Sequence, residues 1–294
     1  MIPQVKLLTR ALGTPGPAVP DSRLLREVAG GRPAAFQPLI ERHWQPVRSY
    51  LGTCVGDPRT ADRLAEEALA WAYRLALRQL GSTLPWRVEV LASARSSAIR
   101  LLLQEYGACA LTPGFRRWAM AGGPRPLNTT RDRLTKSYRR LPPSQQTLLW
   151  HTAVECEDTD RVAAITGTRP AHVTAALGRA LTALREEYTA LYRRAVEQRP
   201  TCADTARTLS AAANATVAYV DPEGHLAGCA LCQECRSDLF DLRGGLRRQL
   251  PVMLLGWWDE SGYRRQLAET SPPRLPQLPQ LPQDLLAQEK PHWW

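Results

Sequence analysis

The chain has 294 residues, with 38 lysine and arginine side chains against 28 aspartate and glutamate side chains, which gives a formal net charge of +10. This length predicts two or three small domains, each able to bury a core. There is no uncharged apolar run of about 18 residues and no signal-peptide pattern at the start, so we expect a cytoplasmic protein without a membrane partner.

The N-terminal third has the apolar spacing of amphipathic helices throughout. Asp21 and Thr60 stand where helix N-caps are expected, and Pro85 stands where a helix begins. Almost no alternating strand pattern occurs, so the expected fold class is all-α. The expected helices cover residues 21–28, 33–55, 60–80 and 85–106.

Basic charge is concentrated in the middle of the chain. Residues 106–140 carry 8 basic and 1 acidic side chains, whereas residues 201–294 carry 9 basic and 11 acidic ones. The part of the chain before residue 140 is therefore expected to attract a polyanion. The last third has more acidic than basic side chains, so it is expected to have a different role. The expected units are 21–106, a basic linker at 107–134, a helical unit at 135–198, a cysteine-rich unit at 200–250 and an extended proline-rich tail at 271–294.

A helix-turn-helix pattern occupies residues 158–184. Small and apolar residues precede Gly167, which permits a tight turn, and Pro170 starts a second helix. In DNA-binding versions the start of the second helix enters the major groove. An ordinary helical hairpin is the alternative interpretation. The side chains expected to meet DNA are Arg169 and Arg179, which suit phosphates, and His172, Thr174 and Ala175, which would face the bases.

Three potential metal ligands follow the helix opening at Asp221-Pro222. On one continuous helix, His225, Cys229 and Cys232 would project from the same face. Cys202, 23 residues before His225, would complete a closed set of three cysteines and one histidine for one structural Zn²⁺ ion. Cys235 lies further around the helix and is expected to be a spare thiol. The alternative is a set of buried structural cysteines.

The order of these segments resembles that of extracytoplasmic-function (ECF) sigma factors. Residues 24–73 resemble the first conserved domain of that family, through the segments GRPAAFQPLIERHWQPVRSYL and GDPRTADRLAEEALAWAYR. The segment LPWRVEVLASARSSAIR resembles the closing helix of the same domain. Their second domain resembles LPPSQQTLLWHTAVE, the helix-turn-helix and RALTALR. The resemblance covers roughly 21–105 and 135–195. It implies a first domain that binds core RNA polymerase and melts the promoter −10 element, and a second that reads the −35 element. The polymerase-binding residues it implies are Asp62, Glu66, Leu69 and Trp71.

Two departures from the family pattern bear on this interpretation. Arg100 and the leucines at 101–103 stand where the family has aspartate followed by arginines. Because this removes phosphate anchors, readout of the −10 element is either lost or shifted to the linker. Arg161 replaces a usual glutamate at a position expected to face outward. The linker side chains that would take over are Arg116, Arg117 and Arg125.

The cysteine-rich unit resembles zinc-binding anti-sigma proteins, which share a His-x₃-Cys-x₂-Cys motif. That family binds sigma factors and sometimes senses oxidants. The sequence thus predicts a bacterial sigma factor with a fused zinc-binding regulatory unit; its partners would be core RNA polymerase, promoter DNA, and its own C-terminal unit or a separate regulator. The alternative is a degenerate sigma-like module for interaction or redox sensing that does not initiate transcription. No phosphate loop, His-Glu-x-x-His or nucleophile elbow occurs, so no enzyme is expected.

Overall fold

The computed structural model describes residues 19–78, 84–104, 107–123, 133–215, 217–218, 221 and 224–269. Within these ranges every regular element is a helix, apart from one isolated bridge between Val55 and Leu111. The all-α fold class is therefore confirmed. No helix in these ranges combines the length and apolarity needed to cross a membrane. The expected proline-rich tail and Arg125 lie outside the described residues.

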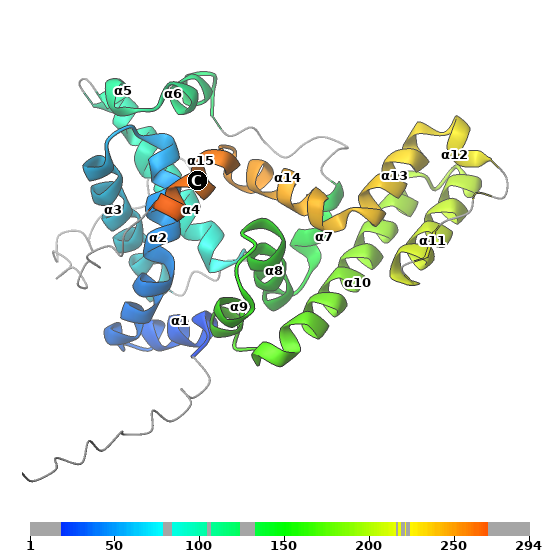
Figure 1. Cartoon of the computed structure of the whole chain (residues 1–294), viewed down its shortest axis with the longest axis horizontal. Helices are drawn as coiled ribbons and strands as arrows, with labels where there is room; N and C mark the ends of the chain where they lie inside the picture. Colours follow the sequence, from blue (N-terminus) through cyan, green and yellow to red (C-terminus); the bar gives the residue numbers. More distant parts are fainter. Residues whose placement is uncertain are drawn as a thin grey trace, which may run out of the picture.

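Four helices form the N-terminal helical unit, drawn in blue and cyan in Figure 1. Phe36, Val47 and Leu91 lie in its core, each at most 1% exposed. The expected helices are present, although the third ends at Leu77 and the fourth ends at Arg100 instead of reaching residue 106. The helices are α1 (Asp21–Ala29), α2 (Gln37–Cys54) after a 3-10 turn at Pro33–Phe36, α3 (Pro58–Leu77) and α4 (Trp86–Arg100), which a 3-10 turn at Leu101–Leu103 follows.

Both expected N-caps in this unit are wrong. Asp57, not Thr60, caps α3, because its carboxylate accepts the Thr60 backbone N–H at 2.8 Å. Asp21 lies in the first turn of α1, and its carboxylate bonds to Arg42 at 2.6 Å and His43 at 2.7 Å. Charge-assisted hydrogen bonds of this kind are about twice as strong as neutral ones. Asp21 therefore joins α1 to α2 instead of capping a helix.

The expected basic linker is helical in its first part, which corrects the expectation of irregular structure at 107–134. Pro113 occupies the first turn of a helix, where its missing N–H costs nothing, and the Thr112 side chain caps that helix. Phe115 is buried and meets Trp257 edge-on, with 5.5 Å between ring centroids. Trp257, from the C-terminal part of the chain, therefore packs against this segment. The two helices are α5 (Gly107–Ala110) and α6 (Pro113–Met120).

The middle of the chain forms a second group of helices, here named the helix-turn-helix unit (Figure 1). It consists of α7 (Arg133–Arg140), α8 (Pro143–Leu149), a π-helical turn (Trp150–Val154), α9 (Thr159–Thr166) and α10 (Pro170–Ala195). The first half of α10 belongs to the helix-turn-helix. Its second half buries Tyr188 and Tyr192. One helix therefore spans from the candidate DNA-binding end to the cysteine-rich unit.

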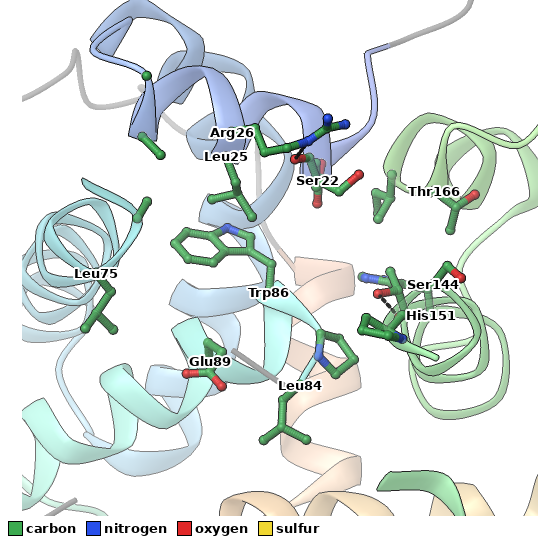
Figure 2. Close-up of a pocket in the computed structure, with 18 residues that line it drawn as sticks. Ser22, Leu25, Arg26, Leu75, Leu84, Trp86, Glu89, Ser144, His151 and Thr166 are labelled. Carbon is green, nitrogen blue, oxygen red and sulfur yellow. Dashed lines mark hydrogen bonds between the residues drawn. The ribbon is translucent and has the colours of Figure 1, made fainter. Parts of the chain in front are cut away.

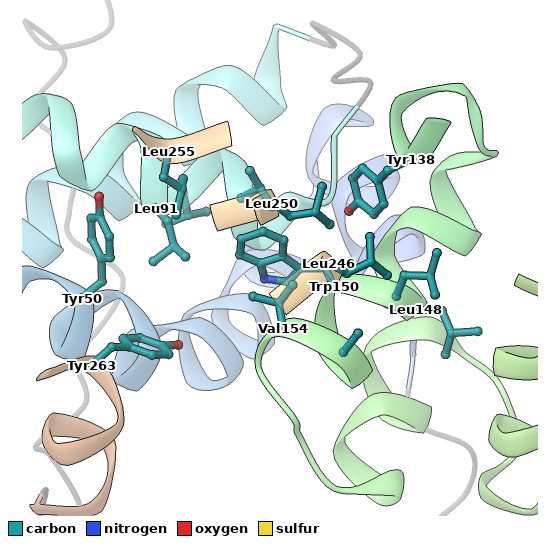
Figure 3. Packing of buried hydrophobic residues seen from close by; sticks show 14 of the residues in the cluster. Tyr50, Leu91, Tyr138, Leu148, Trp150, Val154, Leu246, Leu250, Leu255 and Tyr263 are labelled. Carbon is teal, nitrogen blue, oxygen red and sulfur yellow. The ribbon is translucent and has the colours of Figure 1, made fainter. Parts of the chain in front are cut away.

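Within the described residues, the five helices after α10 divide into two groups (Figure 1). The helices α11 (Pro200–Ala215), α12 (His225–Gly228) and α13 (Ala230–Phe240) lie along the second half of α10, away from the N-terminal helical unit. The helices α14 (Leu242–Leu255) and α15 (Glu260–Glu269) return toward that unit. In Figure 3, Leu246 and Leu250 of α14 lie beside Trp150, and Leu255 lies beside Leu91. The helices α14 and α15 thus pack against the two larger units, which are the N-terminal helical unit and the helix-turn-helix unit.

Buried charges also join the N-terminal helical unit to the helix-turn-helix unit. The Arg87 guanidinium is fully buried; it donates to His43 Nδ1 at 2.7 Å, to Glu157 at 3.2 Å and to Glu155. His151 Nδ1 lies 2.6 Å from Glu157. This set, with Asp21, is named the Arg87 cluster: Asp21, His43, Arg87, His151, Glu155 and Glu157.

The two histidines of the Arg87 cluster differ in charge. Burial lowers the pKa of His43, whose neutral ring accepts from Arg87 at Nδ1 and donates from Nε2 to Asp21. Burial also opposes protonation of His151, but Glu157 and Glu155 outweigh it and raise the pKa of His151 to about 9. His151 is therefore an imidazolium at neutral pH. Two cations, Arg87 and His151, thus neutralise the two buried glutamates.

Candidate metal centre and nucleic-acid interface

Cys202, His225, Cys229 and Cys232 lie together, as the sequence predicts. One ligand atom from each residue lies within 4.8 Å of the other three. Cys202 Sγ, from α11, is 3.5 Å from His225 Nε2 and 3.8 Å from Cys229 Sγ. Cys202 and Cys232 are buried, whereas His225 and Cys229 are half-buried. The cluster thus lies where α11 approaches the junction between α12 and α13.

These separations match a tetrahedral zinc site. Zn–S bonds of about 2.3 Å and Zn–N bonds of about 2.0–2.1 Å, at tetrahedral angles, place two sulfurs about 3.8 Å apart and a sulfur about 3.5 Å from a nitrogen. Three thiolates and one imidazole are a donor set of structural zinc sites. A Zn²⁺ ion held by all four side chains would link α11 to α13 and leave no open position for a substrate.

The ligands reach this arrangement through a helix break, which corrects the expectation of one continuous helix. The helix α12 ends at Gly228, and Cys229 has an extended backbone with φ −124° before α13 begins. Asp221 bonds the backbone N–H groups of His225 at 3.2 Å and Leu226 at 2.7 Å, so it caps α12 as a side chain from outside the helix. Cys229 and Cys232 then span the first turn of α13 and point to the same side.

The protonation state of the thiols follows from their places in the fold. Burial raises the pKa of Cys232 to about 12 before a metal binds. Burial also acts on Cys229, but backbone N–H groups at the start of α13 outweigh it and lower its pKa. Zinc binds thiolates, so binding must displace at least the Cys232 proton. Zinc affinity is therefore expected to rise with pH.

Two neighbouring side chains complete the candidate metal centre. The Tyr192 hydroxyl of α10 lies 3.2 Å from Cys232 Sγ, where it can donate to a metal-bound thiolate. The sequence interpretation missed Tyr192, because its helix lies 40 residues upstream of Cys232. Cys235 is fully buried and lies outside the cluster, as expected for a spare thiol. Burial raises the pKa of Cys235 to about 12, which keeps it a neutral thiol.

The expected tight turn between α9 and α10 is present. Asp158 caps α9 by accepting the Arg161 backbone N–H at 2.8 Å. The helix ends at Gly167, whose φ of +73° strains any residue with a side chain. A Cβ at Gly167 would also lie 2.9 Å from the ring of Pro20. Gly167 therefore sets the turn and allows α1 to approach it closely.

The side chains expected to contact DNA share one exposed surface at the start of α10. Val173 points inward and is only 4% exposed, so the opposite face of α10 lies toward solvent. The exposed residues are Arg169, His172, Thr174, Ala175 and Arg179. Further along α10, Leu184 is buried, whereas Leu177 and Leu181 are half-buried. The structure thus leaves all five predicted side chains accessible.

The polymerase-binding residues implied by the resemblance do not form one exposed face. Glu66 is exposed, and Asp62 is half-exposed in an ion pair with Arg48. Leu69 is only 3% exposed and belongs to the core, which corrects its expected place on a binding surface. Trp71 is half-buried, with the Arg74 guanidinium 4.2 Å from its ring centroid. Of the four, Asp62, Glu66 and Trp71 remain accessible.

The two departures from the sigma pattern have different structural settings. Arg100 donates to Ser97 at 2.7 Å and pairs with Glu67 at 3.3 Å, while Leu103 is 81% exposed. Arg161 does not simply face outward, because its guanidinium donates to the Arg42 carbonyl at 2.7 Å. This bond ties α9 to α2. Of the linker arginines, Arg117 is exposed and Arg116 is half-buried.

Comparison with known proteins found no relative of this chain. No family model matches it, and neither the curated proteins nor the solved structures contain a significant match. Function is therefore inferred from the motifs, the side chains and their geometry.

Proposed function

We propose that this chain is a sigma factor of the ECF group, which joins core RNA polymerase in the cytoplasm and directs it to particular promoters. A fused zinc-binding unit would modulate this activity. The observation that carries the proposal is the helix-turn-helix, whose second helix begins with an exposed, basic surface. The order of the sigma-like segments along the chain supports the same function.

The start of α10 has the chemistry that base readout needs. His172 and Thr174 offer hydrogen-bonding groups, and Ala175 offers a small apolar contact for a thymine methyl group. Arg169 and Arg179 flank them on the exposed side, where they would contact phosphates. In helix-turn-helix proteins, side chains at this end of the second helix contact base edges in the major groove.

Alanine substitutions on α10 are expected to separate phosphate contacts from base contacts. Arg179→Ala should weaken binding to every DNA sequence and reduce the salt dependence by about one phosphate contact. His172→Ala or Thr174→Ala should instead change sequence preference, by about 1–3 kcal/mol for each lost base contact. Fluorescence anisotropy over a salt series measures both effects. Arg193→Ala, exposed near the other end of α10, is the control. If all three substitutions leave binding unchanged, α9 and α10 form only a structural hairpin.

Charge reversal on α3 is expected to impair polymerase binding without unfolding the chain. Asp62→Lys with Glu66→Lys places two positive charges on the accessible part of the implied interface. The loss of the Asp62–Arg48 pair should cost at most about 1 kcal/mol, because surface ion pairs contribute little. Glu186→Lys, exposed on α10, is the matched control. Undiminished affinity for core polymerase in a variant with a native melting curve would remove this assignment.

The zinc-binding unit is connected to the rest of the chain through α14. The helix α13, which carries Cys232, is followed directly by α14, which packs against α4 and the π-helical turn. A change at the metal centre would therefore reach both larger units through α14. This connection supports a regulatory role for the zinc-binding unit.

Run-off transcription with purified core RNA polymerase tests the proposal. A sigma factor yields promoter-dependent transcripts and a gel shift that requires core polymerase. The alternative, a sigma-like interaction or redox-sensing module, yields neither, and it would still bind zinc. The transcription result thus discriminates the two functions independently of the metal centre.

A further inference from the structure

A cavity of about 570 Å³ lies between the N-terminal helical unit and the helix-turn-helix unit (Figure 2). One wall comes from α1, the end of α3 and the start of α4. The other comes from α8, the π-helical turn and α9. Small-molecule sites in proteins commonly have volumes of about 300–1,000 Å³ and lie between structural units. The cavity is distinct from the metal centre and from the exposed surface of α10.

One end of the cavity is apolar. Leu25, Leu75 and Leu84 surround the Trp86 indole there (Figure 2). The buried Nε1 atom of Trp86 has no hydrogen-bond partner among the described residues. An indole N–H that is buried without a partner is uncommon in proteins, because it loses its hydrogen bond to water. The Trp86 ring and the leucines around it therefore suit a flat or branched apolar group.

The other end of the cavity holds hydrogen-bond donors, among them His151, whose positive charge is already paired with Glu157. His151 contributes an imidazolium that is 1% exposed, and its bond to Glu157 uses only Nδ1. Nε2–H thus remains for a ligand. Ser144 lies beside His151, and Ser22 and Arg26 line the cavity from α1 on the facing wall (Figure 2). These groups together favour an anion over a cation.

The acidic side chains that line the cavity do not cancel this preference. Asp21 is already bonded to Arg42 and His43, so its charge is compensated. Glu89 lies near Leu84, at the apolar end and away from Ser144 (Figure 2). Because the hydrogen-bond donors lie away from Glu89, they would hold the negative group of a ligand near His151.

We propose that this cavity binds a small organic carboxylic acid with an aromatic or branched apolar body. The carboxylate accepts hydrogen bonds from His151 and the neighbouring hydroxyl groups, while the apolar body packs against Trp86 and Leu25. The ligand contacts both larger units at once. It therefore binds their packed arrangement more tightly than any separated one, and stabilises that arrangement by mass action. This inference does not depend on the proposed sigma function.

Three probes with the same fluorinated ring and different charges test the inference on the full chain. Fluorophenylpropionate carries a carboxylate, fluorophenylpropanol is neutral and fluorophenylpropylamine is a cation. Fluorine NMR line broadening and isothermal titration calorimetry measure their binding. The acid is expected to bind at least tenfold more tightly than the alcohol, to raise the melting temperature, and to outcompete the amine. Equal binding of all three probes, or no binding of the acid at millimolar concentration, would overturn the proposal.

Variants locate the binding to the cavity. His151→Asn keeps an amide donor for Glu157 but removes the Nε2–H and the charge, so the acid should bind tenfold or more weakly. Trp86→Phe removes part of the indole surface on which the apolar body packs, and it should weaken binding several-fold. Trp118→Phe, in α6 outside the cavity, is the control and should leave binding unchanged. If His151→Asn fails to fold, Ala76→Leu fills the cavity from α3 and should abolish binding; acid binding that survives Ala76→Leu contradicts the proposed site.

Discussion

Replacing Cys202 with serine, or removing zinc with a chelator, is expected to loosen α11–α13 while α1–α9 stay folded. Cys202 is the ligand from α11, so its loss breaks the metal link to α13. Zinc binding supplies about 10–16 kcal/mol to isolated zinc-finger peptides, which exceeds the stability of many whole domains. Metal analysis should find one Zn²⁺ per native chain. Hydrogen exchange should show the largest increase in rate in residues 200–240.

The other cysteines provide the controls for this experiment. Cys235→Ser changes a buried thiol that lies outside the cluster, so it should keep zinc even if it lowers stability. Cys109→Ser changes an exposed thiol and should alter neither property. Replacing His225, Cys229 or Cys232 should reproduce the loss seen with Cys202→Ser. Full zinc retention in Cys202→Ser, together with loss in Cys235→Ser, would show that the fourth ligand is Cys235.

Arg87→Met is expected to destabilise the folded chain by about 3–5 kcal/mol, the usual cost of removing one partner of a buried ion pair. Methionine keeps most of the side-chain volume but leaves Glu155 and Glu157 buried with only part of their charge compensated. These two glutamates join the helix-turn-helix unit to α4. Denaturant unfolding should therefore show a lower midpoint, accompanied by a looser contact between the two larger units.

Two further variants test the cause of this loss. Arg63→Met breaks an exposed pair with Glu67 and should cost less than about 0.5 kcal/mol. Adding Glu155→Gln to Arg87→Met removes one uncompensated charge and should restore part of the lost stability. An unfolding midpoint for Arg87→Met equal to that of Arg63→Met would mean that the buried pair contributes no net stability.

Local chemistry explains which features could be predicted from the sequence. His225, Cys229 and Cys232 could be found because soft donors three and four residues apart project from one side of a helical segment. Cys202, 23 residues before His225, was added as the fourth ligand that a closed zinc site needs. Gly167 could be placed in a turn because a left-handed backbone favours glycine. The caps were harder to predict. Asp21 has the side chain of a cap, but a basic pair 21 and 22 residues away binds it more strongly.

The contacts between the units could not be predicted in the same way. Nothing near Arg87 in the sequence distinguishes it from the other arginines, since its carboxylate partners lie 68 and 70 residues later. The return of α14 and α15 to the N-terminal helical unit was also missed. Leu246 and Leu250 show only that one face of a helix is apolar, and an apolar face does not specify which surface covers it.

The sequence by itself determined the all-α class, the positions of most helices, the tight turn at Gly167 and the set of four candidate metal ligands. Apart from the choice of Cys202, each depends on residues close together in the chain or on a spacing that helix geometry repeats. Only the tertiary structure decided that Leu69 is buried, that Tyr192 approaches Cys232, and that His151 faces a cavity between two units. These depend on side chains brought together by packing, whose partners cannot be read from local spacing.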